Sequence, residues 1–204
     1  MASSPIRIGI TGGIATGKTT VTNYIAQTYG FPILDADLYA HQAVALGSPL
    51  LHQIQQRYSD RILLPTGELD RPQLGQIIFQ DATEKRWLEQ LIHPYVRQQF
   101  EMAMSSLKDR RCVLLAIPLL FEAQLEELVD QIWVVSCAEH QQLARLMARN
   151  GLTQTDAIAR INNQMPLANK IALADHVIDN DQSLEVLHHQ IDQLIHQLPC
   201  SQKN

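Results

Sequence analysis

The chain has 204 residues, of which 46% are hydrophobic and 18% are charged, and its formal net charge is −5 at pH 7. This composition is typical of an ordinary globular protein. The acidic balance argues against general nucleic-acid binding, which needs a basic surface. Every apolar run ends well before the length that a bilayer requires. We therefore expect a soluble protein with neither a nucleic-acid partner nor a membrane partner.

The N-terminus and the cysteines favour a cytoplasmic location. The first residues, MASSPIRIGI, contain no cationic stretch followed by an apolar segment, so they do not resemble a secretory signal. Cys112, Cys137 and Cys200 are far apart and form no CxxC pair. We therefore expect neither a disulfide framework nor a zinc site, as is usual in a reducing compartment.

Five short apolar runs rich in β-branched residues predict the strands of a sheet. They are IRIGI, FPIL, CVLLAI, QIWVV and HVI, which begin at residues 6, 31, 112, 131 and 176. Their nearly continuous hydrophobicity suits parallel strands covered on both faces. Helical patterns separate the runs, and this alternation predicts an α/β fold.

Capping residues and breakers predict where the helices begin and end. The first helix is expected to begin within GKTT and to stop at Gly30. Further helices follow side chains that are suited to capping, namely Asp37, Ser48, Asp70 and Thr153. Pro94 lies inside the strongly helical stretch 82–107 and is expected to break or kink it.

The spacing of these elements predicts a core with two helical additions. Residues 37–107 are helical in pattern and lie between the second and third strands, which is too long for a plain crossover. We interpret them as an inserted helical subdomain and residues 139–164 as a helix–turn–helix lid. The remaining segments, 5–36, 108–138 and 165–200, are expected to form the core of a single domain spanning residues 1–204.

The stretch GITGGIATGKTT, residues 9–20, predicts a nucleotide phosphate site. It matches GxxxxGK[ST] without a gap, between a strand and a helix. Small residues leave backbone N–H groups open to phosphates, the lysine reaches the β- and γ-phosphates, and the threonine hydroxyl can ligate Mg²⁺. A glycine turn with an exposed lysine is the alternative. The expected nucleotide contacts are Gly12, Gly13, Ile14, Ala15, Thr16, Gly17, Lys18 and Thr19, with Thr19 as the metal ligand.

Two other classes of phosphate-loop protein lack their markers in this chain. A GTPase carries NKxD, but the Asn-Lys pair at 169–170 is followed by Ile-Ala. A motor-type ATPase ends its third strand with an acidic residue, whereas CVLLAIPLL ends in proline and leucines. The remaining large class transfers a γ-phosphoryl group to a small acceptor, with a cationic lid and a carboxylate near the attacking hydroxyl.

The chain has candidates for the carboxylate and the cations. Asp35 and Asp37 follow the second strand, at the sheet edge where open α/β sheets bind ligands. Asp35 is expected to accept the hydroxyl proton or to orient Mg²⁺, whereas Asp37 is better explained as a helix cap. Arg145 and Arg149 share one helical face, and Arg160 lies on the next helix. We expect Arg149 to neutralise charge on the transferred group, and a solvated basic face is the alternative.

Seven motifs occur in the order found in dephospho-CoA kinases. They are GITGGIATGKTTV, LDAD, HPYVR, IPLLFE, RLMARNGLT, ARINNQMP and ADHVIDN, and they run from Ile6 to about Asn180. The chain thus resembles this family over nearly its whole length. DAD combined with HP and PLLFE is far more specific than the phosphate loop, which alone indicates only a nucleotide.

The resemblance implies an α/β P-loop core with a five-stranded parallel sheet flanked by helices, a helical acceptor (CoA) subdomain and a helical lid. It also implies transfer of the ATP γ-phosphate to the ribose 3′-hydroxyl of dephospho-CoA, giving coenzyme A and ADP in the last step of coenzyme A synthesis. ATP and dephospho-CoA are then the substrates and Mg²⁺ the metal. We expect a cytoplasmic enzyme that is a monomer or a weak homo-oligomer.

The resemblance further implies roles for single residues. Lys18 and Thr19 serve the phosphates and Mg²⁺, Asp35 resembles the proposed general base, and Arg149 matches a lid arginine at the phosphates. Asn180 is expected near the adenine ring. The implied acceptor contacts are Asp35, His93, Arg97, Pro118, Leu119, Leu120, Phe121 and Glu122. A helix-kink role for His93, and a core role for Phe121 and the two leucines, are the alternatives.

The sequence departs from the family pattern at a few positions. Ala15 and Thr16 stand where Gly-Ser is frequent and Thr19 where serine is usual, yet the loop keeps its backbone approach and its hydroxyl. His41 stands where arginine is frequent, which weakens the expectation of a cation gripping the acceptor there. Two other functions remain open, a kinase for another nucleoside or nucleotide and, less favoured, an inactive ATP-binding regulatory module.

Overall fold

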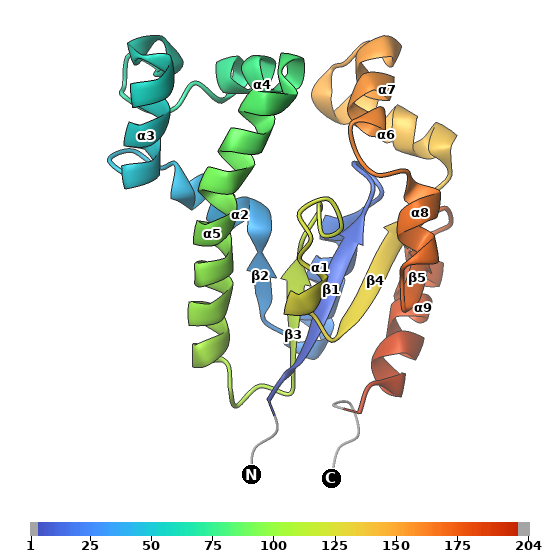
Figure 1. The fold of residues 1–204 in the computed structure, drawn as a ribbon. Coiled ribbons are helices and arrows are strands. Elements are labelled where there is room, and N and C mark those ends of the chain that lie inside the picture. The colour runs from blue at the N-terminus through green and yellow to red at the C-terminus, as the bar shows by residue number, and fades with distance from the viewer. Residues whose placement is uncertain (1–3, 200–204) are drawn as a thin grey trace. The chain divides into compact units, whose positions relative to one another are not determined.

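Five parallel strands form one sheet in the computed structural model, which describes residues 4–199 (Figure 1). The strands are β1 (Ile6–Gly12), β2 (Ile33–Asp35), β3 (Cys112–Ala116), β4 (Gln131–Ser136) and β5 (His176–Asp179). Their order is β2-β3-β1-β4-β5, and every neighbouring pair is parallel. The predicted fold class, an α/β fold with a five-stranded parallel sheet, is confirmed.

Helices connect the strands, and several of them follow β2 and precede β3 along the chain. In chain order they are α1 (Lys18–Tyr29), α2 (Ala36–Ala43), α3 (Pro49–Tyr58), α4 (Arg71–Gln80), α5 (Ala82–Ser106), α6 (Glu139–Asn150), α7 (Gln154–Asn162), α8 (Leu167–Ala172) and α9 (Leu184–Gln197). Two short 3₁₀ turns, η1 (Asp60–Ile62) and η2 (Glu126–Leu128), complete the described elements.

Most of the predicted helix ends are observed. The side chains of Ser48, Asp70 and Thr153 each accept a hydrogen bond from the backbone N–H three residues later, at 3.1, 3.0 and 3.2 Å. These bonds satisfy N–H groups that a helix leaves unpaired at its first turn. Gly30 ends α1 in the left-handed conformation, which glycine adopts without a steric penalty.

One predicted helix start is wrong. α2 begins at Ala36, directly after β2, so Asp37 lies in its first turn and not at its cap. There its charge still interacts favourably with the helix dipole. Of the two outcomes expected at Pro94, a break or a kink, the break does not occur, and α5 continues through the proline. Buried Leu88 and Phe100 lie on either side of the proline, and their packing stabilises both halves of the helix.

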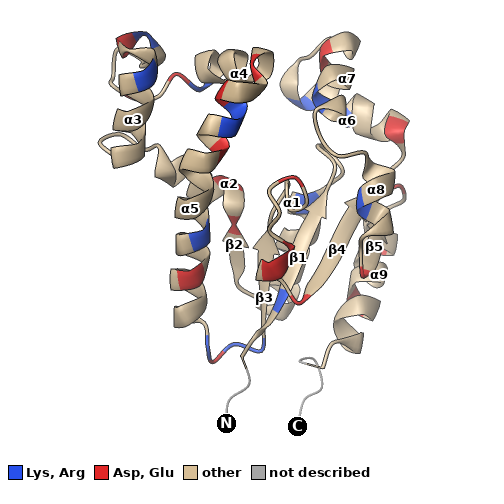
Figure 2. Cartoon of the chain, in the orientation of Figure 1, with Lys and Arg blue, Asp and Glu red and all other residues tan. Residues whose placement is uncertain are grey.

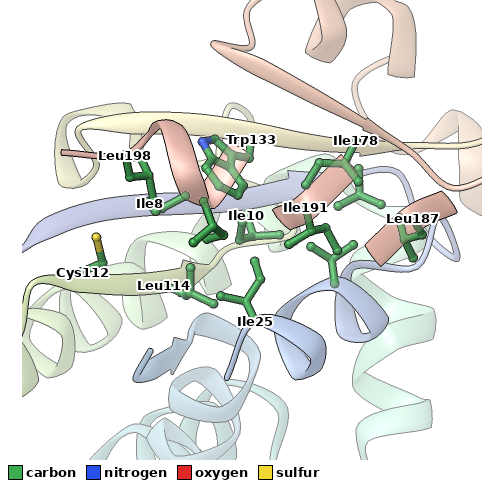
Figure 3. Packing of buried hydrophobic residues seen from close by; sticks show 13 residues of the cluster. Ile8, Ile10, Ile25, Cys112, Leu114, Trp133, Ile178, Leu187, Ile191 and Leu198 are labelled. Atoms are coloured by element: carbon green, nitrogen blue, oxygen red, sulfur yellow. The ribbon is translucent and has the colours of Figure 1, made fainter. Parts of the chain in front are cut away.

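The main core lies between the sheet and the helices α1 and α9 (Figure 3). Alternate residues of the strands, such as Ile8 and Ile10 of β1, point into this cluster and are completely buried. Val21 and Ile25 contribute from α1, and α9 contributes every fourth residue. The cluster consists of Ile8, Ile10, Val21, Ile25, Cys112, Leu114, Trp133, Val135, Ile178, Leu187, Ile191, Ile195 and Leu198. It holds β1 and α1 firmly on either side of the phosphate loop.

The cysteines of the described residues lie in the core. Cys112 is buried in β3, within the cluster that packs against the sheet. Cys137 is buried and free, and burial raises the pKa of its thiol. Cys200 lies outside the described residues.

The chain divides into two compact units. One contains the sheet and comprises residues 1–35 and 107–204, and the other is helical and comprises residues 36–106. The assignment of an acceptor function to 37–107 and of a lid function to 139–164 stays a prediction.

Figure 2 shows acidic and basic residues interspersed along α5, which agrees with a helix that faces solvent on one side.

The helical unit has its own core and one prominent ion pair. Arg57 of α3 binds Glu84 of α5 through Nε at 2.6 Å and Nη2 at 2.7 Å, and the Tyr58 hydroxyl donates to the same carboxylate. The guanidinium also lies 4.5 Å from the centre of the Trp87 ring. Hydrogen bonds from Arg57 and Tyr58 lower the pKa of Glu84 to about 2. This carboxylate therefore joins α3 to α5.

We predict that Glu84→Gln removes an acid-sensitive part of the protein's stability. Because the folded pKa of Glu84 lies below its ordinary value of 4.5, its stabilising contribution is present above that value and is lost as the pH falls toward 2. Thermal unfolding between about pH 5 and pH 3 should show a steeper fall of the midpoint for wild type than for the variant. Glu89→Gln, which removes an exposed pair with Lys85 at 3.9 Å, is the matched control. Equal slopes for wild type and Glu84→Gln would contradict the prediction.

Candidate functional site

The phosphate loop, residues 12–19, joins β1 to α1 and leaves no room for larger side chains. Gly12 and Gly17 have φ values of 147° and 105°, which favour glycine. A Cβ atom on Gly12 would lie 2.3 Å from the Val135 carbonyl oxygen, and one on Gly17 would lie 2.1 Å from Nδ2 of Asn180. The glycines therefore serve two needs, an unusual backbone conformation and close packing against β4 and the residue after β5.

Side chains of a lysine and a threonine form hydrogen bonds with backbone carbonyls inside the loop. Nζ of Lys18 donates to the carbonyl oxygens of Gly12 at 3.2 Å and of Gly13 at 2.9 Å. The hydroxyl of Thr16 also donates to the Gly13 carbonyl, at 2.9 Å. The ammonium group is therefore held at the start of the loop by two of its own carbonyl oxygens.

Ala15 carries backbone strain within this loop. Its φ is 60°, in the left-handed region where a residue with a Cβ atom is disfavoured. The sequence indicated only that alanine stiffens the loop at this position. The structure adds that the position itself is left-handed, which explains why glycine is well suited to it. Strain of this kind is maintained by surrounding contacts and is common at functional sites.

Asn180 and Arg145 support the loop from the side of β5. Nδ2 of Asn180 donates to the backbone carbonyl of Thr16 at 2.8 Å. The backbone carbonyl of Asn180 accepts a hydrogen bond from Nη2 of Arg145 at 2.9 Å. Nη2 of Arg145 also donates to Gln141 at 2.8 Å, and its Nη1 is buried without a hydrogen-bond partner in the described part of the chain. The predicted nucleotide residue Asn180 therefore contacts the loop directly, and Arg145 is linked to it.

Two glutamines hold the middle of the loop. The side-chain oxygen of Gln164 accepts from the Ile14 N–H at 2.8 Å, and Nε2 of Gln142 donates to the Ile14 carbonyl at 2.9 Å. Gln142 lies in the first turn of α6 and Gln164 just after α7. A Cβ atom on Gly13 would lie 2.5 Å from Nε2 of Gln142. The helices of the predicted lid are thus anchored to the loop by side-chain amides.

Asp35 lies at the carboxyl edge of the sheet. β2 aligns Asp35 with Ala116 of β3, and β3 aligns Ala116 with Ile10 of β1. These three residues form one row, and the phosphate loop begins just beyond its β1 end. One strand lies between Asp35 and β1, so their backbones are about 10 Å apart at the usual strand spacing.

The segment 118–122 follows β3 and contains the PLLFE motif. The Pro118 carbonyl accepts from the Thr11 hydroxyl at 3.2 Å and from Nζ of Lys170 at 3.1 Å. Leu120 and Phe121 are buried, whereas Leu119 is 38% exposed. Of these three apolar side chains, Leu119 is therefore the one whose surface is most available to a ligand.

The arginines of the predicted lid differ in their surroundings. Arg149 is exposed at the end of α6, and its Nε donates to Asn150 at 3.0 Å. Arg160 is exposed on α7. Arg145, in contrast, is partly buried beside Asn180. In this structure Arg145 is the arginine that is hydrogen-bonded to Asn180. The expected role of Arg149 at the phosphates stays a prediction.

His93 and Arg97 lie one turn apart on α5, in the helical unit. Both side chains are partly buried. Burial and the nearby charge of Arg97 lower the pKa of His93, although Glu89 acts in the opposite direction. The imidazole is therefore held in its neutral form near pH 7, where it can either donate or accept a hydrogen bond.

Sequence reasoning missed three residues that the structure brings to the loop and to PLLFE. Gln164 stands within the motif ARINNQMP, but nothing in its residue type indicated a contact with Ile14. Gln142 and Lys170 carried no signal, because glutamine and lysine on helices are usually solvated. All three have side chains that bind backbone or charged groups of segments distant in sequence.

Within residues 4–199, no three His, Cys, Asp or Glu side chains gather in a way that could hold a metal ion. Likewise, no helix in that range has the length and apolar character needed to cross a membrane.

Comparisons with known proteins agree on one family. The family model for dephospho-CoA kinase matches residues 6–185. A dephospho-CoA kinase from a Synechocystis species is 56% identical over 184 residues, which are 90% of this chain and 92% of that protein. A dephospho-CoA kinase from Trichormus variabilis is 57% identical over 185 residues, which are 91% of this chain and 94% of that protein.

Solved structures show the same similarity. A Thermus thermophilus protein has a TM-score of 0.79 at 33% identity, covering 96% of this chain and 99% of that one. The dephospho-CoA kinase from Campylobacter jejuni has a TM-score of 0.70 at 29% identity, covering 94% and 96%. A shikimate kinase from Bacteroides thetaiotaomicron, with a TM-score of 0.55 at 13% identity over 93% and 95%, shares the fold.

We predict that Gly17→Ala weakens nucleotide binding by at least about tenfold. The new Cβ atom would displace Asn180 and would occupy a strained φ, which disturbs the loop by more than about 1.4 kcal/mol. Titration calorimetry with a magnesium nucleotide measures the change. Gly75→Ala in α4, where an added Cβ meets nothing within 4 Å, is the matched control and should bind as wild type does. Unchanged affinity in Gly17→Ala would show that the loop tolerates the side chain.

Proposed function

Because the chain belongs to the dephospho-CoA kinase family, we propose that its phosphate loop, Asp35 and lid arginines transfer the γ-phosphoryl group of ATP to the ribose 3′-hydroxyl of dephospho-CoA. The chain is a kinase of coenzyme A biosynthesis. The observation that carries this conclusion is the family match across residues 6–185, which include a complete phosphate loop. The roles of single residues below are our proposal.

The loop and Lys18 bind the phosphates of ATP. Backbone N–H groups of residues 12–19 surround them, since the glycines leave the backbone accessible. Lys18, whose ammonium group is hydrogen-bonded to the Gly12 and Gly13 carbonyls, reaches a β- or γ-phosphate oxygen of the bound nucleotide. Its positive charge stabilises the charge that spreads over the transferred group. Asn180 and Arg145 support the nucleotide on the β5 side.

The residues present fit a Mg²⁺ ion that is bound together with ATP. Mg²⁺ usually keeps several waters and is held by substrate phosphates and one or two protein oxygens. Thr19, exposed in the first turn of α1, offers a hydroxyl for this purpose, and Asp35 offers a carboxylate. The ion, when bound, neutralises phosphate charge.

Asp35 receives the proton of the attacking hydroxyl. The 3′-oxygen forms a bond to the γ-phosphorus while the bond from that phosphorus to the β–γ bridging oxygen breaks, and ADP leaves. The proton passes from the hydroxyl to the Asp35 carboxylate. Its place at the carboxyl edge of the sheet, in one row with the strand that leads into the loop, supports this role.

The lid arginines and the acceptor contacts complete the proposal. Arg149 and Arg160, together with Arg145, approach the phosphates when the lid closes and excludes water. The hydrogen bonds of Gln142 and Gln164 to Ile14 keep these helices next to the loop, and this proximity supports a role of their arginines at the phosphates. The acceptor is bound by the segment 118–122 and, from the helical unit, by His93 and Arg97. We also propose a cytoplasmic location and a monomer or weak homo-oligomer.

The first experiment measures ATP consumption by the purified protein with Mg²⁺, with and without dephospho-CoA. We expect acceptor-dependent turnover and a product one phosphoryl group heavier than the acceptor, identified by mass spectrometry. Other nucleosides and nucleotides, tested as acceptors, address the alternative of a different kinase. A folded protein that binds ATP but shows no turnover with dephospho-CoA would overturn the proposed function.

We further predict that Lys18→Ala and Asp35→Asn each reduce kcat by about 10²-fold or more. The first removes charge stabilisation, and the second removes the proton acceptor while keeping nearly the same shape. Thermal unfolding of both variants should stay close to wild type, which separates a catalytic loss from misfolding. A nearly unchanged kcat for Asp35→Asn would exclude Asp35 as the base.

A further inference from the structure

Lys170 is a buried lysine that no step of the proposed reaction uses. Its side chain, on α8, is completely inaccessible to solvent. Nζ lies 2.9 Å from Oε1 and 3.1 Å from Oε2 of Glu122, and it donates to the Pro118 carbonyl at 3.1 Å. One ammonium group therefore binds both ends of the segment 118–122.

The same segment is bound at a second point. The backbone N–H of Met165 donates to Oε1 of Glu122 at 2.9 Å. The residue before it, Gln164, accepts from the Ile14 N–H of the phosphate loop at 2.8 Å. Residues 164–170 therefore contact the phosphate loop at one end and the segment 118–122 at several points.

A further hydrogen bond connects the segment 118–122 to the strand residue that precedes the phosphate loop. The Pro118 carbonyl, which accepts from Lys170, also accepts from the hydroxyl of Thr11, at 3.2 Å. Thr11 is completely buried and directly precedes Gly12. The phosphate loop and the segment 118–122 are thus joined on one side through Thr11 and on the other through Gln164 and Met165.

Stability alone does not account for a buried lysine at this place. The Glu122 side chain keeps 23% of its surface exposed, whereas Lys170 is removed from water completely, and burying an ammonium group is expensive even when it is paired. What the pair provides is directionality, because N–H donors fix the positions of the oxygens that they bind. Here those oxygens belong to Pro118 and Glu122, at the two ends of one segment.

We propose that Lys170 is a positioning residue for phosphoryl transfer, which sets the segment 118–122 at a fixed distance from the phosphate loop through Pro118 and Glu122. This inference rests on the proposed function, in which that segment contacts the acceptor. Glu122 then acts through Lys170 and Met165 and holds the segment in place. Because a displacement of about 1 Å in bound reactants can reduce a rate about 10²-fold, a loosened segment slows transfer while leaving the nucleotide site intact.

The decisive variant replaces both partners, as Lys170→Met with Glu122→Gln. It leaves no unpaired buried charge, and the glutamine oxygen still accepts from the Met165 N–H. We expect an unfolding midpoint at or near that of wild type, a kcat about 10- to 100-fold lower and a KM for ATP within about twofold. A role in stability alone predicts that kcat returns together with the midpoint. The proposal is therefore overturned if the folded double variant has a kcat within about twofold of wild type.

A second pair of variants tests the contact between Gln164 and the phosphate loop without disturbing a buried charge. Gln164→Ala removes the acceptor for the Ile14 N–H, and it should lower kcat with little change in the unfolding midpoint. Gln154→Ala, at the exposed first residue of α7, removes a glutamine that makes no contact with the loop in the described structure and should behave as wild type. A kcat equal to that of wild type for Gln164→Ala would contradict the idea that the contact between Gln164 and the phosphate loop helps to position the segment 118–122.

The wild-type assay separates this inference from the proposed function. If wild-type protein shows no transfer to dephospho-CoA, the proposed function fails, and the positioning role fails with it. If wild type transfers the phosphoryl group and the double variant does so equally fast, the positioning role alone is wrong. Acceptor-independent ATP hydrolysis, measured in the same samples, should not fall in the double variant, because the phosphate loop is unchanged.

Discussion

The close approach of backbone to backbone around the phosphate loop is the constraint on which the rest of the structure depends. Phosphate binding requires N–H groups without side chains in front of them, and only glycine meets this need at Gly12 and Gly17. The same absence of side chains lets Val135 and Asn180 pack directly on the loop. The loop's shape is therefore fixed by its neighbours. The strained Ala15 lies between Ile14 and Thr16, whose carbonyls accept hydrogen bonds from Gln142 and Asn180.

The strand order turns this local constraint into a site. β1 lies between β3 and β4, so the segments that follow all three strands meet at one edge of the sheet. β3 leads to the segment 118–122, β4 leads to α6 with Gln142 and Arg145, and β2 ends at Asp35 one strand further away. The loop, the Asp35 carboxylate and the helices α6 and α7 thus come from separate parts of the chain and share a single support, the buried sheet.

Charged side chains have different effects in the two units. In the helical unit, Arg57 and Glu84 form a partly exposed pair that joins two helices, and its effect is on stability. In the unit with the sheet, Lys170 is fully buried and binds oxygens of a segment next to the phosphate loop. Burial of the ammonium group is costly for stability, and its hydrogen bonds restrict the geometry of the segment. Restricted geometry is what the transfer of a group between two bound molecules requires.

The sequence by itself determined the parallel sheet, the phosphate loop and the family, because each depends on local patterns: apolar runs, glycine spacing and ordered motifs. Only the tertiary structure decided that α5 passes through Pro94 and that Arg145 contacts Asn180. It also brought Gln142, Gln164 and Lys170 to backbone groups more than 50 residues away in the chain. Such contacts depend on distances after folding, and neither residue type nor spacing along the chain specifies those distances.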